Sequence, residues 1–298
     1  MKYLLSLLVA IFYINANASD ELKIVTSFSI LEDITKNIVQ DKATVISIIP
    51  IESDAHAYNL HPKDLITINK SDLFIINSLG FETFLKNIEK LPNIKEKTVI
   101  ATEGINAHNI SHDSEHHHEH HEHNHGNKDP HAWQDPQNAI IYVKNITNAL
   151  CLKDSTNCES YKTNADNYIQ KINELDNQYK NIFANIKQEN RVFLTTHDAF
   201  NYLAEHYDIK IYSLVGIDSN TEPSPKQIAI INNLIKDLSV KSIFIENITN
   251  NAIINQIAKQ NNVKINGTLY SDSLSSKDAQ TYLDFLEHNL KILSDSMK

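Results

Sequence analysis

The chain has 298 residues, which is enough for two domains that each bury a hydrophobic core. Lys and Arg number 27 against 37 Asp and Glu, so the formal net charge is −10, which argues against binding to nucleic acid or to an anionic membrane through the overall field of the protein. The five glycines argue against Gly-rich phosphate-binding loops, whereas the 15 histidines point toward metal binding.

The first 18 residues have the pattern of a secretory signal peptide. Lys2 precedes the short apolar run Leu4–Ile14, and Ala16-Asn17-Ala18 supplies the small residues of a cleavage site. The apolar run is too short to span a bilayer. Because no cysteine lies near the cleavage site, we expect the mature protein to be soluble in the periplasm and not lipid-anchored.

From Leu22 onward, short β-branched runs alternate with longer amphipathic segments, which predicts parallel sheets flanked by helices. The pattern occurs twice, so we expect an α/β fold with two lobes, residues 19–152 and 191–298. The predicted strands are Leu22–Ser27, Thr44–Ile49, Leu73–Ile76, Thr98–Ala101, Val192–Thr195, Ile209–Val215, Ser242–Glu246 and Lys264–Leu269. The predicted helices are Leu31–Val39, His61–Lys70, Glu82–Lys90, Ala199–Tyr207, Pro225–Leu238, Ala252–Gln260 and Lys277–Ser294.

A helical region separates the two lobes. Asp135-Pro136 is a strong helix start, and that helix should end near Leu152. Residues 160–190 contain no Gly or Pro, and their apolar residues recur at spacings of three and four. This pattern predicts one long helix within a linking segment, residues 153–190. A helical hairpin within one domain is the alternative.

Cys151 and Cys158 are the two cysteines of the chain. In an exported protein such a pair predicts a disulfide that closes a small loop. Two reduced thiols in a metal site are the alternative, although neither cysteine is near a histidine in the sequence.

A histidine-rich segment spans residues 112–125 and contains nothing apolar, so it should form a mobile loop outside the core. Imidazoles beside carboxylates bind zinc, copper or nickel loosely and in many geometries. A pH-sensing or merely solvated loop is the alternative. The histidines of this predicted metal-binding loop are His112, His116, His117, His118, His120, His121, His123 and His125.

Part of this segment, residues 121–125, also matches the H-E-x-x-H pattern of zinc proteases. That motif requires a stable helix to bring both imidazoles to one face. The segment has no helical apolar periodicity, so a protease is not predicted.

Three further histidines and one aspartate lie after predicted strands. His56, His131 and His197 each follow a strand or lie in the connection after it, and Asp272 follows the strand Lys264–Leu269. In parallel α/β sheets, binding sites form at the carboxyl ends of strands. Since each lobe contributes two of these residues, a cleft between the lobes could gather all four around one metal ion.

The segments around these residues resemble the zinc-binding (ZnuA-like) solute-binding proteins of metal-uptake ABC transporters. The resemblance covers essentially the whole mature chain. It is carried by Asp54-Ala55-His56-Ala57-Tyr58 through Pro62 and Asp64, by Asp129-Pro130-His131-Ala132-Trp133, by His197-Asp198-Ala199-Phe200, and by Gly216-Ile217 with Glu222-Pro223-Ser224-Pro225. The histidine-rich insertion stands where zinc-specific members carry one.

The resemblance implies two α/β lobes joined by one long rigid helix, with a metal ion held between them by His56, His131, His197 and Asp272. Water or a carboxylate of the loop is the alternative to Asp272. It also implies a periplasmic Zn²⁺-binding protein that delivers its ion to a membrane permease with a cytoplasmic ATPase. A monomer is expected.

Three imidazoles and one carboxylate suit four-coordinate Zn²⁺. Manganese-binding relatives tend to have a carboxylate at the position of His197, so a manganese or iron binder is the alternative within the family. An exported zinc hydrolase is the alternative from another class, with Asp198 or Glu246 as its base. We expect no enzymatic activity, and an additional role as an adhesin stays open.

Overall fold

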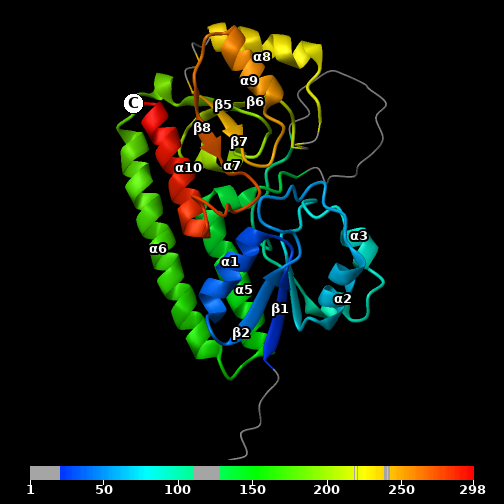
Figure 1. Ribbon diagram of the computed structural model, residues 1–298. Coiled ribbons are helices and arrows are strands. Elements are labelled where there is room, and N and C mark those ends of the chain that lie inside the picture. Colours follow the sequence, from blue (N-terminus) through cyan, green and yellow to red (C-terminus); the bar gives the residue numbers. More distant parts are fainter. Residues whose placement is uncertain (1–20, 111–127, 218, 220, 238–239, 241) are drawn as a thin grey trace, which may run out of the picture.

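The computed structural model describes residues 21–110 and 128–298, except residues 218, 220, 238, 239 and 241. Two separate four-stranded sheets have the orders β2-β1-β3-β4 and β6-β5-β7-β8, and all paired strands are parallel (Figure 1). The predicted α/β fold with two parallel sheets is therefore confirmed. The strands are β1 Leu22–Thr26, β2 Ala43–Ser47, β3 Leu73–Ile76, β4 Thr98–Ile100, β5 Val192–Thr195, β6 Lys210–Ser213, β7 Ile243–Glu246 and β8 Ile265–Leu269.

Helices flank both sheets, and none of the described helices is long and apolar enough to cross a membrane. Helix α5 begins as predicted, because Asp135 accepts a hydrogen bond from the backbone N–H of Gln137 and Pro136 occupies the first turn. The helices are α1 Ser29–Val39, α2 Pro62–Lys70, α3 Leu85–Ile88, α4 Ile94–Lys97, α5 Pro136–Lys153, α6 Cys158–Ala184, α7 Asn201–His206, α8 Pro225–Asp237, α9 Ala252–Gln260 and α10 Tyr282–Ser296, with short 3₁₀ turns at Ala132–Gln134 and Gln188–Asn190.

Several helices are shorter than predicted, among them the predicted helices Glu82–Lys90 and Lys277–Ser294. The predicted helix Glu82–Lys90 is reduced to α3, since the Glu82 carboxylate accepts hydrogen bonds from the backbone N–H groups of Asn77 and Ser78. The last helix begins at Tyr282 rather than Lys277, where Thr281 forms a capping box.

Helix α6 runs along one side of the molecule past both sheets (Figure 1). With 27 residues it is about 40 Å long. It ends six residues before the predicted Asn190, because the chain turns at Ala184 and buries Ile186 in the core around Phe193. Its first half packs in the core of the first sheet through residues such as Ile172, and its second half packs with the second sheet through Phe183. A single helix therefore joins both cores.

The predicted disulfide between Cys151 and Cys158 is present and closes the turn between α5 and α6. Both cysteines are used in this bond, so the alternative of two thiol ligands does not hold.

The loop after β8 belongs to the core of the first sheet, although it follows a strand of the second. Tyr270, Leu274 and Tyr282 are buried in the hydrophobic cluster of the first sheet. The Trp133 indole N–H donates to the carbonyl of Ser271 at 2.8 Å, and the Tyr282 hydroxyl donates to the carbonyl of Trp133. Residues 270–282 are thus anchored to the amino-terminal half of the protein.

A charged cluster centred on His206 joins α7 to α5 and α6. His206 Nδ1 lies 2.9 Å from Asp135 Oδ1, and its Nε2 lies 2.7 Å from Asp176 Oδ1. Burial alone would lower the pKa of His206, but its hydrogen bonds to the two carboxylates raise it to about 9. The cluster therefore holds a charged imidazolium at neutral pH.

We expect this cluster to make stability depend on pH. A histidine whose pKa is about 9 in the folded protein and ordinary in the unfolded chain stabilises the fold fully below about pH 6.5 and loses that contribution as pH rises through 9. Allowing for solvent screening, the contribution should be about 2 kcal/mol. Urea unfolding of the metal-free protein at pH 7 and at pH 10 would measure it.

The matched variant is His206→Gln, which removes the titrating group. The difference in the free energy of unfolding between the unsubstituted protein and this variant should shrink between pH 7 and pH 10. A difference independent of pH would show that His206 is not held as an imidazolium.

Candidate metal centre

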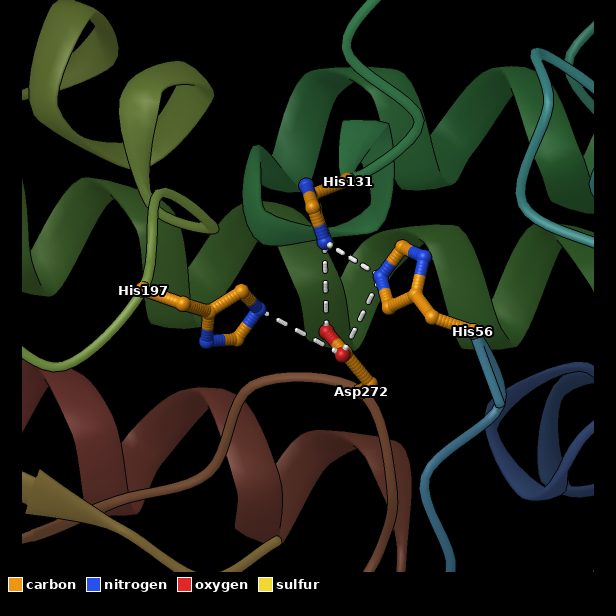
Figure 2. Close-up of side chains that lie close together, drawn as sticks. All are labelled: His56, His131, His197 and Asp272. Carbon is orange, nitrogen blue, oxygen red and sulfur yellow. Dashed lines mark hydrogen bonds and ion pairs between the residues drawn. The ribbon is translucent and has the colours of Figure 1, made fainter. Parts of the chain in front are cut away.

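Four loops at the carboxyl ends of strands bring together the three histidines and the aspartate singled out in the sequence. His56 follows β2, His131 precedes the 3₁₀ turn before α5, His197 follows β5, and Asp272 follows β8. Each residue offers one ligand atom, and these atoms all lie within 4.8 Å of one another. Figure 2 shows the three rings directed at the carboxylate of Asp272.

The short distances converge on Asp272. Its Oδ2 lies 3.4 Å from His56 Nε2 and 3.5 Å from His197 Nε2, and its Oδ1 lies 3.4 Å from His131 Nε2 (Figure 2). The Nε2 atoms of His56 and His131 are 3.2 Å apart. One small cation between these atoms could contact all four side chains.

The centre is shielded from solvent. His131 and His197 are fully buried, and His56 and Asp272 retain 5% and 1% of their surface. The ring of Phe81 packs against His56 and that of Trp133 packs against His131 in T-shaped contacts, with ring centroids 5.0 and 5.3 Å apart. Burial of so many polar groups costs free energy unless they are paired with one another or with an ion.

Asp272 and His197 shift each other's pKa in opposite directions. Burial would raise the pKa of Asp272, but the charges of His197 and His131 lower it well below its ordinary value. Burial would lower the pKa of His197, but the carboxylates of Glu246 and Asp272 raise it well above its ordinary value. A divalent cation can replace the proton on His197 as the positive partner of Asp272.

Two more buried carboxylates face the outer nitrogens of the histidine rings. Asp129 Oδ1 lies 2.8 Å from His131 Nδ1, and Glu246 Oε2 lies 2.5 Å from His197 Nδ1. Sequence reasoning did not assign either residue to the site, and it considered Glu246 only as the base of a hydrolase. For Glu246 the sequence did contain a usable signal, because a charged residue at the end of the otherwise apolar strand β7 indicates a carboxylate at the edge of the sheet where the site forms.

The histidine-rich segment precedes His131 in the chain. Its eight histidines, from His112 to His125, lie outside the described residues. The described chain leads up to the segment at Ile110 and leaves it at Lys128 near His131.

Comparison with known proteins connects this geometry to metal transport. The family model described as zinc-uptake complex component A, periplasmic (ZnuA), matches residues 24–296. A manganese ABC transporter substrate-binding lipoprotein of Streptococcus anginosus is 29% identical, with 95% of this chain and 91% of that protein covered. A metal ABC transporter substrate-binding lipoprotein of Lactococcus lactis is 32% identical, with 91% and 86% covered.

The fold is also similar to that of a periplasmic metal-binding protein of known structure. The Mn-bound periplasmic metal-binding protein from Candidatus Liberibacter asiaticus superimposes with a TM-score of 0.81 at 32% identity, over 93% of this chain and all of that chain. The family indicated by the sequence and the arrangement of the two sheets therefore lead to the same group of proteins.

One prediction is contradicted by these comparisons. We expected a soluble protein that is not lipid-anchored, but the relatives in Streptococcus and Lactococcus are named lipoproteins. The prediction rested on the absence of cysteine near Ala18. Retention at a membrane depends on how the first residues of a protein are processed. Residues 1–20 lie outside the described residues, and the position of cysteines alone was not sufficient to predict this processing.

Replacement of His131 tests the candidate centre. We expect His131→Ala to weaken Zn²⁺ binding more than about 100-fold, since loss of a ligand should exceed the loss of a residue that supports one. Titration against a competing chelator would measure the affinity. The control is His61→Ala, because His61 has an exposed side chain and lies outside the cluster. Equal effects of the two substitutions would mean that the centre is misplaced.

Proposed function

Because the chain belongs to the family of periplasmic zinc-uptake components, we propose that it captures Zn²⁺ outside the cytoplasm and delivers the ion to the permease of an ABC importer. A cytoplasmic ATPase would drive transport through that permease. In this proposal His56, His131, His197 and Asp272 are the ligands, the ion is cargo rather than a catalytic cofactor, and the protein acts as a monomer. Since the family is one of transport components, we propose no enzymatic activity.

The spacing of the candidate ligand atoms is the observation that supports zinc. Four of the separations between candidate ligand atoms are 3.2, 3.4, 3.4 and 3.5 Å, and all of these atoms lie within 4.8 Å of one another. A tetrahedron with bonds of about 2.0–2.1 Å, the usual values for Zn²⁺ with nitrogen and oxygen ligands, has edges of about 3.3 Å. Three imidazoles also provide the nitrogen-rich ligand set that zinc prefers.

Manganese is the second candidate, and one feature of the centre favours it. Asp272 presents Oδ1 to His131 and Oδ2 to His56 and His197, so that both oxygens can bind one ion. Two oxygens and three nitrogens make five ligand atoms, which suits a cation that accepts a higher coordination number. Similar proteins are named for manganese or solved with it.

Metal analysis and cobalt spectroscopy together test this proposal. We expect zinc in protein purified without added metal, and intense visible absorption from the Co²⁺-substituted protein, as four-coordinate sites give. Manganese in the purified protein together with the weak absorption of six-coordinate Co²⁺ would favour the second candidate. Binding of neither metal would contradict the proposed function itself.

We also propose that the histidine-rich segment collects zinc loosely and raises its concentration near His131. Deletion of residues 112–125 should lower the number of Zn²⁺ ions bound per protein while leaving the affinity of the buried centre unchanged within about threefold, since weak exposed sites and a closed site bind independently. Isothermal titration of both proteins measures the two quantities.

A loop of the same length with its histidines replaced by serine controls for the change in chain length. Unchanged stoichiometry and unchanged metal acquisition under zinc scarcity would contradict this role.

A further inference from the structure

Glu246 contacts His197 twice, once through the backbone and once through the ring. It ends strand β7 and retains 1% of its surface. Its Oε1 accepts hydrogen bonds from the backbone N–H of His197 at 2.8 Å, from the backbone N–H of Thr196 at 3.0 Å and from the Thr195 hydroxyl at 2.6 Å. Its Oε2 lies 2.5 Å from His197 Nδ1. The carboxylate is therefore fixed on one side by the backbone and faces the imidazole with the other.

The first sheet contains a counterpart of this glutamate. Glu82 is also buried, and it follows β3, the strand that holds the same position in the first sheet as β7 in the second. Its Oε1 accepts from the Ser27 hydroxyl and the Asn77 backbone N–H at 2.6 Å each, and its Oε2 accepts from the backbone N–H of Ser78 at 2.9 Å. Both glutamates therefore tie two strand ends together. Only at Glu246 does one of these described contacts involve a histidine ring.

The contact with the ring decides which nitrogen of His197 can bind a cation. A neutral imidazole carries one N–H, and a carboxylate can only accept. With the N–H on Nδ1 facing Glu246, the lone pair is on Nε2, which is directed at Asp272. The opposite tautomer would place the hydrogen on the nitrogen that faces the centre and block coordination.

A carboxylate is the one side chain of this shape that meets both demands. Three donors converge on Oε1, and the ring nitrogen Nδ1 lies against Oε2, so with a proton on Nδ1 both ends of the group must accept. A glutamine amide has one oxygen and one NH₂ group. Whichever way the amide is turned, it sets a donor against a donor, either at the backbone or at the ring.

We propose that Glu246 is a positioning residue that holds His197 as an Nε2 ligand and thereby sets the strength of metal binding. The inference rests on the proposed metal centre. It assigns Glu246 a role that its counterpart Glu82 does not have, although both residues stabilise their sheets.

Matched substitutions test the inference. With Zn²⁺ as the probe and a competing chelator, Glu246→Gln should bind about 10- to 100-fold more weakly than the unsubstituted protein. Glu82→Gln removes a carboxylate with equivalent backbone contacts and should change the affinity by less than about threefold, even where it lowers the melting temperature. His197→Ala gives the effect of losing the ligand itself.

The outcomes separate the two proposals. If the unsubstituted protein does not bind Zn²⁺, the proposed function fails. If it binds and Glu246→Gln binds equally well, or Glu82→Gln is weakened as much as Glu246→Gln, the positioning role is wrong.

Nitrogen NMR of the Zn²⁺-loaded, unsubstituted protein tests the same inference without a variant that must fold. With ¹⁵N-labelled histidine, assigned by comparison with His197→Ala, the Nε2 of His197 should show the shift of a metal-bound nitrogen and Nδ1 should carry a proton. A structural role alone does not fix this pattern. Metal on Nδ1 of His197, or a proton on its Nε2, would overturn the proposal.

Discussion

The buried carboxylate of Asp272 is the constraint on which the centre depends. A negative charge with almost no access to water is costly unless a positive charge lies against it. A proton on His197 can supply that positive charge, since the carboxylates of Glu246 and Asp272 raise the pKa of His197 against the effect of burial. A divalent cation supplies the same compensation. The geometry therefore couples metal binding to the loss of a proton, as expected for a site built from imidazoles.

The loops that carry the four side chains of the centre are supported by two different hydrophobic cores. The residues adjoining His56 and His131 pack in the core of the first sheet, and the loop that carries Asp272 is anchored to the same core by Trp133 and Tyr282. His197 follows β5 and is held by Glu246 of the second sheet. Three of the four residues thus share one support, and His197 has another. Helix α6, which packs in both cores, and the charged cluster of His206 fix the position of one support relative to the other.

Most of the fold could be predicted from the sequence because its signals are local. Strands β3 and β5 and helix α9 have the predicted bounds, since apolar runs and helical periodicity are read within one element. The errors occur where a residue is used by a distant partner. Glu82 was placed in a helix, but its carboxylate ties the ends of two strands together. The interpretation of α6 as a helix was correct, yet its end depends on where Ile186 is buried in a core formed by other segments.

By itself, the sequence determined the α/β alternation, the disulfide and the four residues at strand ends that meet in the centre, because each is marked by a local pattern or by a motif of the family. The tertiary structure decided what depends on distances between remote segments. It gave the separations near 3.4 Å around Asp272, the anchoring of residues 270–282 to the first core, and the carboxylates behind His131 and His197. These contacts join residues up to about 200 positions apart in the chain, and no periodicity along a sequence encodes which carboxylate will face which ring nitrogen.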